Sequence, residues 1–424
     1  MKIPLCFFLL FCALGAVAET PTTPAPCTVV VDPGYEVGPP SLTIACKDTT
    51  ATPAIEVTDL ITGEVVPVHD SGSGKVQLPA SETTSRFLST TVTLGGEELL
   101  KWNTLVLAKG APLKDYAGQQ PYTPPADFDA YWERAKAELD AVPPNAKMEE
   151  VVEKGTAKSR LYKVTLDTIR ETKIVCWYTV PVGAFDESGA AAKKWPAAII
   201  MPGYGAEEPP LDRTKDGMIT LSVNPRNHGP SKEYWKSPVE HLAYNIEDPE
   251  NFYYKLAYMD CLQASRWLMT RNEIDATKVC AEGGSQGGAF AIALGALEPR
   301  IACVVSNLTA FSDYADGMIL AQKGFHRQYA DLLAGEKTPE ARALMGKSMS
   351  YTDGVNMARL VHAPTQINVG GIDPVVPYVC GIVVLNHLPA DTKKEIHITA
   401  TAKHEVPGTV REANMRWMKE WMKF

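Results

Sequence analysis

Long hydrophobic runs are missing from this chain of 424 residues, because no segment reaches the ~20 consecutive apolar residues that a membrane-spanning helix needs. Clusters of basic residues are also missing, and the formal net charge is −9. Such a surface repels phosphate backbones, which argues against nucleic acid as a partner. The CxxC and HxxxH spacings typical of metal sites are absent as well. The sequence therefore predicts a protein without a membrane span, a metal ion or a cofactor.

Residues 1–18 have the pattern of a secretory signal peptide. Lys2 precedes an apolar run from Ile3 to Leu14, and a site of small residues ends at Ala18. Cleavage after Ala18 would give a secreted or periplasmic protein. A lipid anchor on Cys12 is the alternative, but a bulky phenylalanine stands before it, where a small residue is expected.

The cysteines fall into two groups. Cys27 and Cys46 lie in a β-patterned segment, where an exported protein is permitted a disulfide, and the sequence leaves open whether they form one. The others outside the predicted signal peptide lie in apolar strand or helix patterns, where a free thiol acts as a small buried hydrophobe. They are Cys176, Cys261, Cys280, Cys303 and Cys380.

Residues 27–108 form a series of short β-patterned runs separated by Pro, Gly and Ser clusters, which predicts a small β-sandwich. It could bind carbohydrate, act as a spacer or form a wall at an active-site entrance. A proline-rich linker is predicted for residues 109–125. The expected strands are Thr28 to Val31, Ser41 to Cys46, Ile55 to Asp59, Val65 to Val68, Leu88 to Leu94 and Thr104 to Leu107.

From residue 126 to 424 the pattern alternates between apolar strands and helices of ten or more residues. This alternation predicts an α/β domain with a doubly wound, mostly parallel sheet covered on both faces. The segment from Phe311 to Arg359 has no strand pattern and is expected to be a helical insertion over the carboxyl edge of the sheet. Expected strands include Ala197 to Met201, Lys278 to Ala281, Gln366 to Val369 and Lys394 to Thr399, and expected helices include Gly287 to Leu297, Pro374 to Leu388 and Val406 to Met422.

The sequence Gly283-Gly284-Ser285-Gln286-Gly287 stands between an apolar strand pattern and a helix pattern. In this context GxSxG forms a tight strand-to-helix turn that presents the serine above the sheet. Ser285 is therefore the predicted nucleophile, and the backbone N–H of Gln286 is a predicted oxyanion donor. An ordinary glycine-rich turn is the alternative.

A serine nucleophile needs a histidine as base and a carboxylate to orient it, in the chain order Ser, Asp or Glu, His. His404 follows the last predicted strand, at the carboxyl edge where such a base must lie. Asp373 follows the strand before it, whereas the competing Asp391 follows a helix and is expected at the opposite edge. Asp373 could instead only cap the next helix. The remaining histidines after the serine lie in less suitable elements, namely His326, His362, His387 and His397.

The loop after the strand Ala197 to Met201 reads Pro202-Gly203-Tyr204-Gly205. Glycines on either side let the Tyr204 amide approach a ligand closely, so Tyr204 is the second predicted oxyanion donor. A simple turn is the alternative.

From about residue 125 onward the chain resembles the acetyl xylan esterase and cephalosporin C deacetylase family of α/β-hydrolases. The resemblance implies that Ser285, Asp373 and His404 form the triad, and that the amides of Tyr204 and Gln286 form the oxyanion hole. It also implies removal of O-acetyl groups from xylose units and related small esters. The matching stretches are Asp127-Phe128-Asp129-Ala130-Tyr131-Trp132, the Pro202 to Gly205 loop, Tyr253 to Asp260, Gly283 to Ala289, and His404-Glu405.

The chain also departs from this family. Where members usually have Arg-Gly-Gln, it has Arg226-Asn227-His228, so the packing below the oxyanion loop is expected to differ. Arg226 and His228 are predicted to support the site from behind. His228 is expected to do so through a hydrogen bond, and a polar residue of the pocket itself is the alternative. Asp373 is followed by Pro374-Val375-Val376-Pro377, which alters one wall of the pocket. The simplest members lack the front β-domain and are often hexamers, so a homo-oligomer is compatible with the resemblance.

These patterns together predict an exported serine carboxylesterase that removes O-acetyl groups from carbohydrate or from small esters through an acyl-enzyme. A serine peptidase of the prolyl oligopeptidase kind shares the order of the triad, but its usual front domain is a long propeller. A glycan-binding protein with an inactive hydrolase domain is a further alternative.

Overall fold

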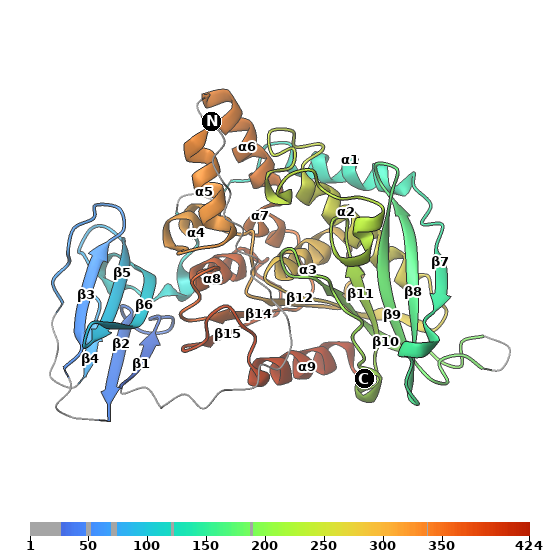
Figure 1. Cartoon of the computed structure of the whole chain (residues 1–424), viewed down its shortest axis with the longest axis horizontal. Coiled ribbons are helices and arrows are strands. Elements are labelled where there is room, and N and C mark those ends of the chain that lie inside the picture. Colours follow the sequence, from blue (N-terminus) through green and yellow to red (C-terminus); the bar gives the residue numbers. More distant parts are fainter. Residues whose placement is uncertain (1–26, 48–51, 69–73, 120–122, 187–189, 337) are drawn as a thin grey trace.

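The structure is a computed structural model that describes residues 27–47, 52–68, 74–119, 123–186, 190–336 and 338–424 (Figure 1). The predicted signal peptide lies outside the described residues. Within them, no helix combines the length and the apolar character that crossing a bilayer requires.

A nine-stranded sheet forms the centre of the larger part of the molecule, in the order β15-β14-β13-β12-β10-β11-β9-β8-β7. The strands from β15 to β11 run parallel, and β9, β8 and β7 continue the sheet antiparallel. The bounds are β7 (Lys147–Glu150), β8 (Ser159–Thr168), β9 (Thr172–Pro181), β10 (Trp195–Met201), β11 (Ile219–Asn224), β12 (Ile274–Gly284), β13 (Cys303–Asn307), β14 (Thr365–Gly370) and β15 (Lys394–Thr399).

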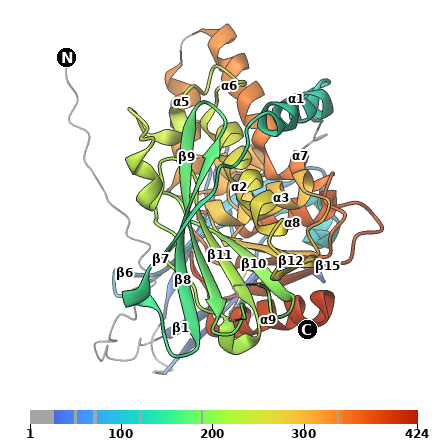
Figure 2. The ribbon, with the colours of Figure 1, turned by 90° about the vertical axis from the view of Figure 1, so that its right-hand side faces the viewer.

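Helices cover both faces of this sheet, as Figures 1 and 2 show: α9 lies on one face, and α2, α3 and α8 lie on the other. Ala198 and Ile200 of β10 share a buried cluster with Trp417 and Met418 of α9. Met201 points to the opposite face. The doubly wound, mostly parallel α/β-hydrolase fold is thus confirmed. The helices are α1 (Phe128–Asp140), α2 (Tyr253–Met269), α3 (Gln286–Leu297), α8 (Tyr378–His387) and α9 (Gly408–Met422).

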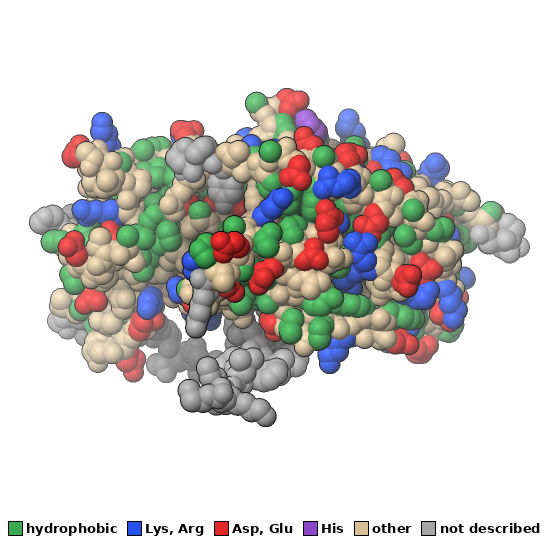
Figure 3. Space-filling view, turned by 90° about the horizontal axis from the view of Figure 1, so that it is seen from above, with side chains coloured by type: hydrophobic (Ala, Val, Ile, Leu, Met, Phe, Trp, Pro, Cys, Tyr) green, Lys and Arg blue, Asp and Glu red, His purple; other side chains and the backbone are tan. Residues whose placement is uncertain are grey.

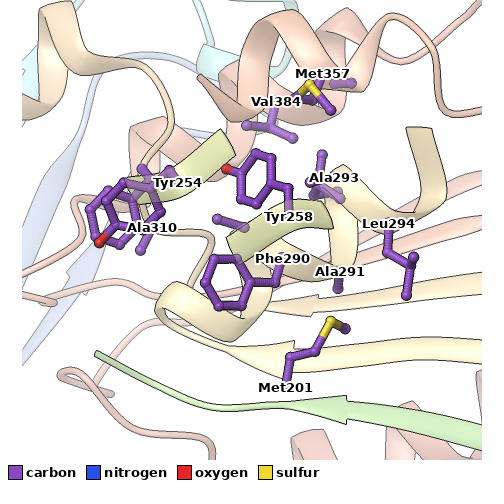
Figure 4. Close-up of a cluster of buried hydrophobic side chains, with 14 of the residues drawn as sticks. Met201, Tyr254, Tyr258, Phe290, Ala291, Ala293, Leu294, Ala310, Met357 and Val384 are labelled. Atoms are coloured by element: carbon purple, nitrogen blue, oxygen red, sulfur yellow. The ribbon is translucent and has the colours of Figure 1, made fainter. Parts of the chain in front are cut away.

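Aromatic side chains fill the core between α2 and α3. The rings of Tyr258 and Phe290 meet edge to face with centroids 5.6 Å apart, above Met201 of β10 (Figure 4). Both α2 and α3 are buried along almost their whole length. This packing fixes the start of α3 relative to the carboxyl ends of the strands.

Two helices begin later than the sequence pattern indicates. We predicted a helix from Pro374, but α8 begins at Tyr378, directly after Pro377. The second, α9, begins at Gly408, after Pro407. A proline favours an extended conformation in the residue before it, so each helix starts only beyond the last proline. The residues freed in this way form the loops that carry Asp373 and His404.

The N-terminal part contains two antiparallel three-stranded sheets, ordered β1-β2-β4 and β3-β5-β6. They lie at the left of Figure 1, beside α4 (Tyr314–Leu320) and α8. Cys27 of β1 and Cys46 of β2 form a disulfide, which answers the question that the sequence left open. The strand predicted at Val65 to Val68 is wrong, since only Val65 makes a bridge, to Thr58, and Pro67 lacks an N–H for a longer ladder. The bounds are β1 (Cys27–Asp32), β2 (Ser41–Cys46), β3 (Ala54–Asp59), β4 (Lys75–Gln77), β5 (Arg86–Leu94) and β6 (Glu97–Val106).

The described residues between Phe311 and Arg359 contain helices joined by short non-helical segments and no strand, as predicted. The helices are α4 (Tyr314–Leu320), α5 (Phe325–Gly335), α6 (Pro339–Thr352) and α7 (Gly354–Ala358). Figure 3 shows the molecule from above the view of Figure 1. On this face, acidic and basic side chains are interspersed with apolar ones.

Candidate active site

Ser285 stands alone between the end of β12 and the start of α3, in a backbone conformation with φ 57° and ψ −120°. A non-glycine residue rarely adopts positive φ, and such residues gather at functional sites. The turn is held by the Ser285 N–H, which donates to Asn307 O of β13 at 2.8 Å. The strand-to-helix turn predicted from the sequence is therefore present, with the serine itself as its strained residue.

The two outer glycines of the motif are required because neighbouring backbone atoms leave no room for a Cβ at either position. A Cβ on Gly287 would lie 2.1 Å from Met201 O at the end of β10. A Cβ on Gly283 would lie 2.3 Å from Gly287 O. Neither contact can be relieved by rotating a side chain, because both involve backbone atoms. The glycines thus allow the serine turn to press directly against the loop that follows β10.

The structure brings together Ser285, His404 and Asp373. His404 Nε2 lies 3.0 Å from Ser285 Oγ, and His404 Nδ1 lies 2.7 Å from Asp373 Oδ2. The other oxygen, Asp373 Oδ1, accepts the N–H groups of Val375 and Val376 at 2.8 and 3.0 Å. Because the carboxylate accepts the Nδ1 proton, Nε2 is left free to take the proton of the serine hydroxyl.

Burial differs along this chain of hydrogen bonds. The Asp373 side chain is fully buried, whereas 13% of the His404 side chain is exposed. Ser285 is half-buried. The carboxylate is thus shielded from water, while His404 and Ser285 remain partly exposed.

The residues that competed with His404 and Asp373 lie elsewhere. His326 is buried in α5 with Nε2 3.0 Å from Ser312 O, and His397 bonds Gln366 within the sheet. Asp391 is exposed, between α8 and the beginning of β15, at the amino edge as predicted.

The predicted oxyanion donors lie on either side of the serine turn. Gln286 is the first residue of α3, so its N–H has no acceptor within the helix, and the positive end of the helix dipole lies at the same place. Tyr204 follows β10 in the loop that Gly287 contacts, and Gly205 takes φ 67° directly after it. The two amides belong to loops that touch each other beside Ser285.

Comparison with known proteins identifies the family of the chain. The sequence pattern of the acetyl xylan esterase family, Acetyl xylan esterase (AXE1), matches residues 106–421. The chain belongs to the acetyl xylan esterase family. It is therefore a carbohydrate esterase by family, and the predicted resemblance is confirmed. The match begins at residue 106, at the end of β6, earlier than expected from the sequence.

Individual relatives carry the names of acetyl esterases or acetyl xylan esterases. The chain is 29% identical over 319 residues to the protein named Acetyl esterase Axe7A of Xylanibacter ruminicola, covering 72% of this chain and 69% of the relative. It is similar to the structure of an acetyl xylan esterase from Paenibacillus sp. R4, with 25% identity, a TM-score of 0.65, and coverage of 73% of this chain and 98% of that one. The structure of Acetyl Xylan Esterase 1 from Thermoanaerobacterium sp. JW/SL YS485 shares the fold, with 23% identity, a TM-score of 0.65 and coverage of 73% and 97%.

In this acetyl xylan esterase family member, the Gln286 side chain is held in a buried network that the sequence did not fully reveal. Its Nε2 lies 2.8 Å from His228 Nε2. Its Oε1 accepts from Tyr254 OH at 3.1 Å and faces His241 Nε2 at 3.3 Å. His228 therefore makes a hydrogen bond, as predicted, and its partner is the residue that follows Ser285. His241 was missed because it lies in a 3₁₀ helix of three residues, His241–Ala243, which is too short for a periodic pattern. Tyr254 was noted only as part of a matching stretch.

A second residue of the esterase that the sequence did not single out fixes the Tyr204 ring. Glu240 accepts a hydrogen bond from Tyr204 OH, and the ring stacks on His241 with centroids 4.2 Å apart. Burial and the neighbouring Glu240 raise the pKa of Tyr204. The ring is thus neutral, and contacts with Glu240 and His241 hold it beside the loop that follows β10.

Arg226 of the esterase supports the site at a distance. Its buried guanidinium donates to both oxygens of Asp260 in α2, from Nε and from an Nη nitrogen, each at 2.8 Å. Its carbonyl oxygen accepts from Tyr253 OH at 2.8 Å. Arg226 thus joins the loop after β11 to α2 and makes no hydrogen bond with the Ser–His–Asp group. The same loop presents His228 to Gln286.

Burial makes His228 a source of acid sensitivity in this esterase. The loss of solvation on burial lowers the pKa of His228 from 6.5 to about 4. Between these values the unfolded chain binds a proton that the folded one does not, so this contribution to stability is present above pH 6.5 and is lost as the pH falls toward 4. His228→Gln can still accept from Gln286 and removes the titration. We expect the loss of unfolding free energy between neutral pH and pH 4 to shrink by about 3 kcal/mol.

Urea unfolding at several pH values measures this effect. His362→Gln, which changes an exposed histidine, is the control and should leave the pH dependence of the parent unchanged. His241 and His326 also have lowered pKa values because of burial, so some acid sensitivity should remain in His228→Gln. Equal pH dependence in His228→Gln and the parent would refute the assignment.

Among the described residues, no three His, Cys, Asp or Glu side chains of this family member come close enough together to hold a metal ion.

Proposed function

We propose that this protein is an exported serine esterase that removes O-acetyl groups from carbohydrate through an acyl-enzyme. The observation that carries the proposal is the continuous chain of hydrogen bonds from Ser285 Oγ through His404 to Asp373 Oδ2, with distances of 3.0 and 2.7 Å. A general base within this reach of a hydroxyl is what nucleophilic catalysis by serine requires.

In the first half of the proposed reaction, Ser285 Oγ attacks the acetyl carbonyl carbon while His404 Nε2 takes the hydroxyl proton. The carbonyl oxygen becomes an oxyanion, which the amides of Tyr204 and Gln286 stabilise. Asp373 stabilises the imidazolium that has formed. The intermediate then collapses as His404 returns the proton to the departing sugar oxygen, leaving an acetyl group on Ser285.

In the second half, a water molecule replaces the sugar. His404 takes one proton from the water as its oxygen attacks the acetyl carbonyl, and the same amides stabilise the second oxyanion. Collapse of this intermediate returns the proton to Ser285 Oγ and releases acetate. The 13% exposure of the His404 side chain is compatible with the entry of water on that side.

The acetyl group and the carbohydrate are supported by the family and by its named members, an acetyl esterase and acetyl xylan esterases. Export is supported by the pattern of residues 1–18 and by the Cys27–Cys46 disulfide, since disulfides persist mainly in oxidising compartments. The choice of sugar depends on the pocket walls, which differ from the usual family pattern after Asp373.

The proposal is tested by measuring acetate released from acetylated xylan, acetylated pectin and cephalosporin C by one purified sample. We expect acetate release from acetylated xylan, and no cleavage of peptide substrates. Peptide cleavage without deacetylation would favour a serine peptidase. Absence of acetate from all three substrates, together with binding to xylan, would favour an inactive glycan-binding protein.

A further inference from the structure

The N-terminal sheets contact the part of the molecule that carries Asp373, and strand β6 makes hydrogen bonds across this contact. Asn103 of β6 donates from Nδ2 to Leu320 O at the end of α4, at 2.8 Å. In return, Gln322 Nε2 donates to Lys101 O of β6 at 3.1 Å. The short segment after α4 is thus hydrogen-bonded to β6 at both ends.

This segment is in turn bonded to the residue that follows the acid. The N–H groups of Gln322 and Lys323 both donate to Pro374 O, at 2.9 and 3.1 Å. Gly324 takes φ 85° and lies so close to Val375 that a Cβ would be 2.6 Å from its side chain. Val375 is one of the two residues whose N–H groups hold Asp373 Oδ1. Only the segment after α4 therefore separates β6 from residues 373–377, which we call the acid loop.

The same strand also reaches the other end of the acid loop. Tyr378, the first residue of α8, is buried, and its hydroxyl forms a hydrogen bond with the Thr104 hydroxyl. Trp102 stacks on the Tyr378 ring with centroids 6.5 Å apart and an interplanar angle of 28°. Residues 373–378 are therefore held at both ends through contacts that β6 makes.

A third set of contacts anchors α4 itself. Asp316 in α4 accepts hydrogen bonds from Tyr116 OH and from Gln119 Nε2, both at 2.8 Å. These donors lie in the predicted proline-rich linker, residues 109–125. The helix that leads into residues 320–322 is thus also bonded to the linker.

We propose that residues 101–104 of β6 are positioning residues for Asp373, so that the N-terminal sheets complete the geometry of the active site. The inference rests on the proposed role of the triad. Asp373 is held by amides of its own loop, so a displaced loop carries the carboxylate away from His404. A misplacement of about 1 Å can cost on the order of 100-fold in rate. The N-terminal part thereby acts on the chemistry without touching the substrate.

Two matched pairs of variants test this proposal. Thr104→Val removes the hydroxyl that bonds Tyr378, whereas Thr90→Val removes an equally buried hydroxyl of β5 that has no hydrogen-bond partner among the described residues. Asn103→Ala removes the bond to Leu320 O. Its control is Gln263→Ala, which removes bonds from α2 to Val142 O and Asp167 O at 2.9 and 3.0 Å, away from the acid loop.

We expect kcat on p-nitrophenyl acetate to fall roughly 10-fold in Thr104→Val and Asn103→Ala, with KM unchanged within about twofold. The acidic limb of the pH–rate profile should move to lower pH, because a displaced carboxylate stabilises the His404 imidazolium less. Both controls should keep the kcat and the pH profile of the parent. A purely structural role would lower the melting temperature of all four variants without moving the pH profile.

The outcomes separate this inference from the proposed function. An active parent whose Thr104 and Asn103 variants match their controls in kcat and pH profile would overturn the positioning role alone. A rise in KM at unchanged kcat would also overturn it. A parent without esterase activity would overturn the proposed function, and this inference with it. As a further check, Thr104→Val and Tyr378→Phe combined should lose no more kcat than either alone, because both remove the same hydrogen bond.

Discussion

Ser285→Ala is expected to lower kcat/KM on p-nitrophenyl acetate by about 10⁴-fold or more, because loss of the nucleophile leaves only binding and oxyanion stabilisation. The fold should be unaffected. The Ser285 hydroxyl bonds His404, while the turn is held by backbone contacts, including the bond from Ser285 N–H to Asn307 O. Steady-state kinetics and thermal unfolding of the same sample measure the two effects.

Covalent labelling gives an independent readout of the same substitution. A fluorophosphonate should label the parent and should not label Ser285→Ala, since it reacts with an activated serine hydroxyl. Ser85→Ala, which changes an exposed serine just before β5, is the control and should be labelled like the parent. Labelling of Ser285→Ala at the rate of the parent would refute the assignment of the nucleophile.

Asp373→Asn has the second largest expected effect, a decrease in kcat of about 10⁴-fold. The asparagine oxygen can still accept the N–H groups of Val375 and Val376, so the loop should keep its shape. Its amide nitrogen would then face His404 Nδ1 and donate to it. The imidazole would carry its proton on Nε2, which could no longer accept the proton of Ser285.

Asp391→Asn is the matched control, because Asp391 was the competing carboxylate and lies exposed before β15. It should keep the kcat of the parent at every pH tested. The measurement is kcat as a function of pH for both variants. Equal activity of Asp373→Asn and the parent would show that the carboxylate only caps the loop, which was the alternative interpretation of its position.

The sequence predicted the central sheet and the placement of Ser285, Asp373 and His404, and the reason is topological. Parallel strands have long apolar runs, and their carboxyl ends share one edge, so residues that follow different strands meet there. The antiparallel strands β7 and β8 were not predicted. All four residues of β7, Lys147–Glu150, are exposed, so this strand has no hydrophobic pattern to recognise.

The surroundings of the site were predicted less completely, because they depend on contacts between distant segments. Position in the chain gave no sign that Tyr254, His228 and His241 converge on the Gln286 side chain. The hydrogen bond of Thr104 with Tyr378 joins residues 274 positions apart. Such pairs carry no periodicity, and only the packed structure shows them.

The backbone of Ser285 has an energetic consequence for the whole molecule. A residue other than glycine held at φ 57° costs on the order of 1–3 kcal/mol, which the surrounding packing must offset. Glycine at this position would relax the turn and raise the melting temperature, yet it would abolish the proposed chemistry. The backbone conformation of Ser285 thus lowers the free energy of unfolding at the position where the proposed chemistry needs a side-chain oxygen.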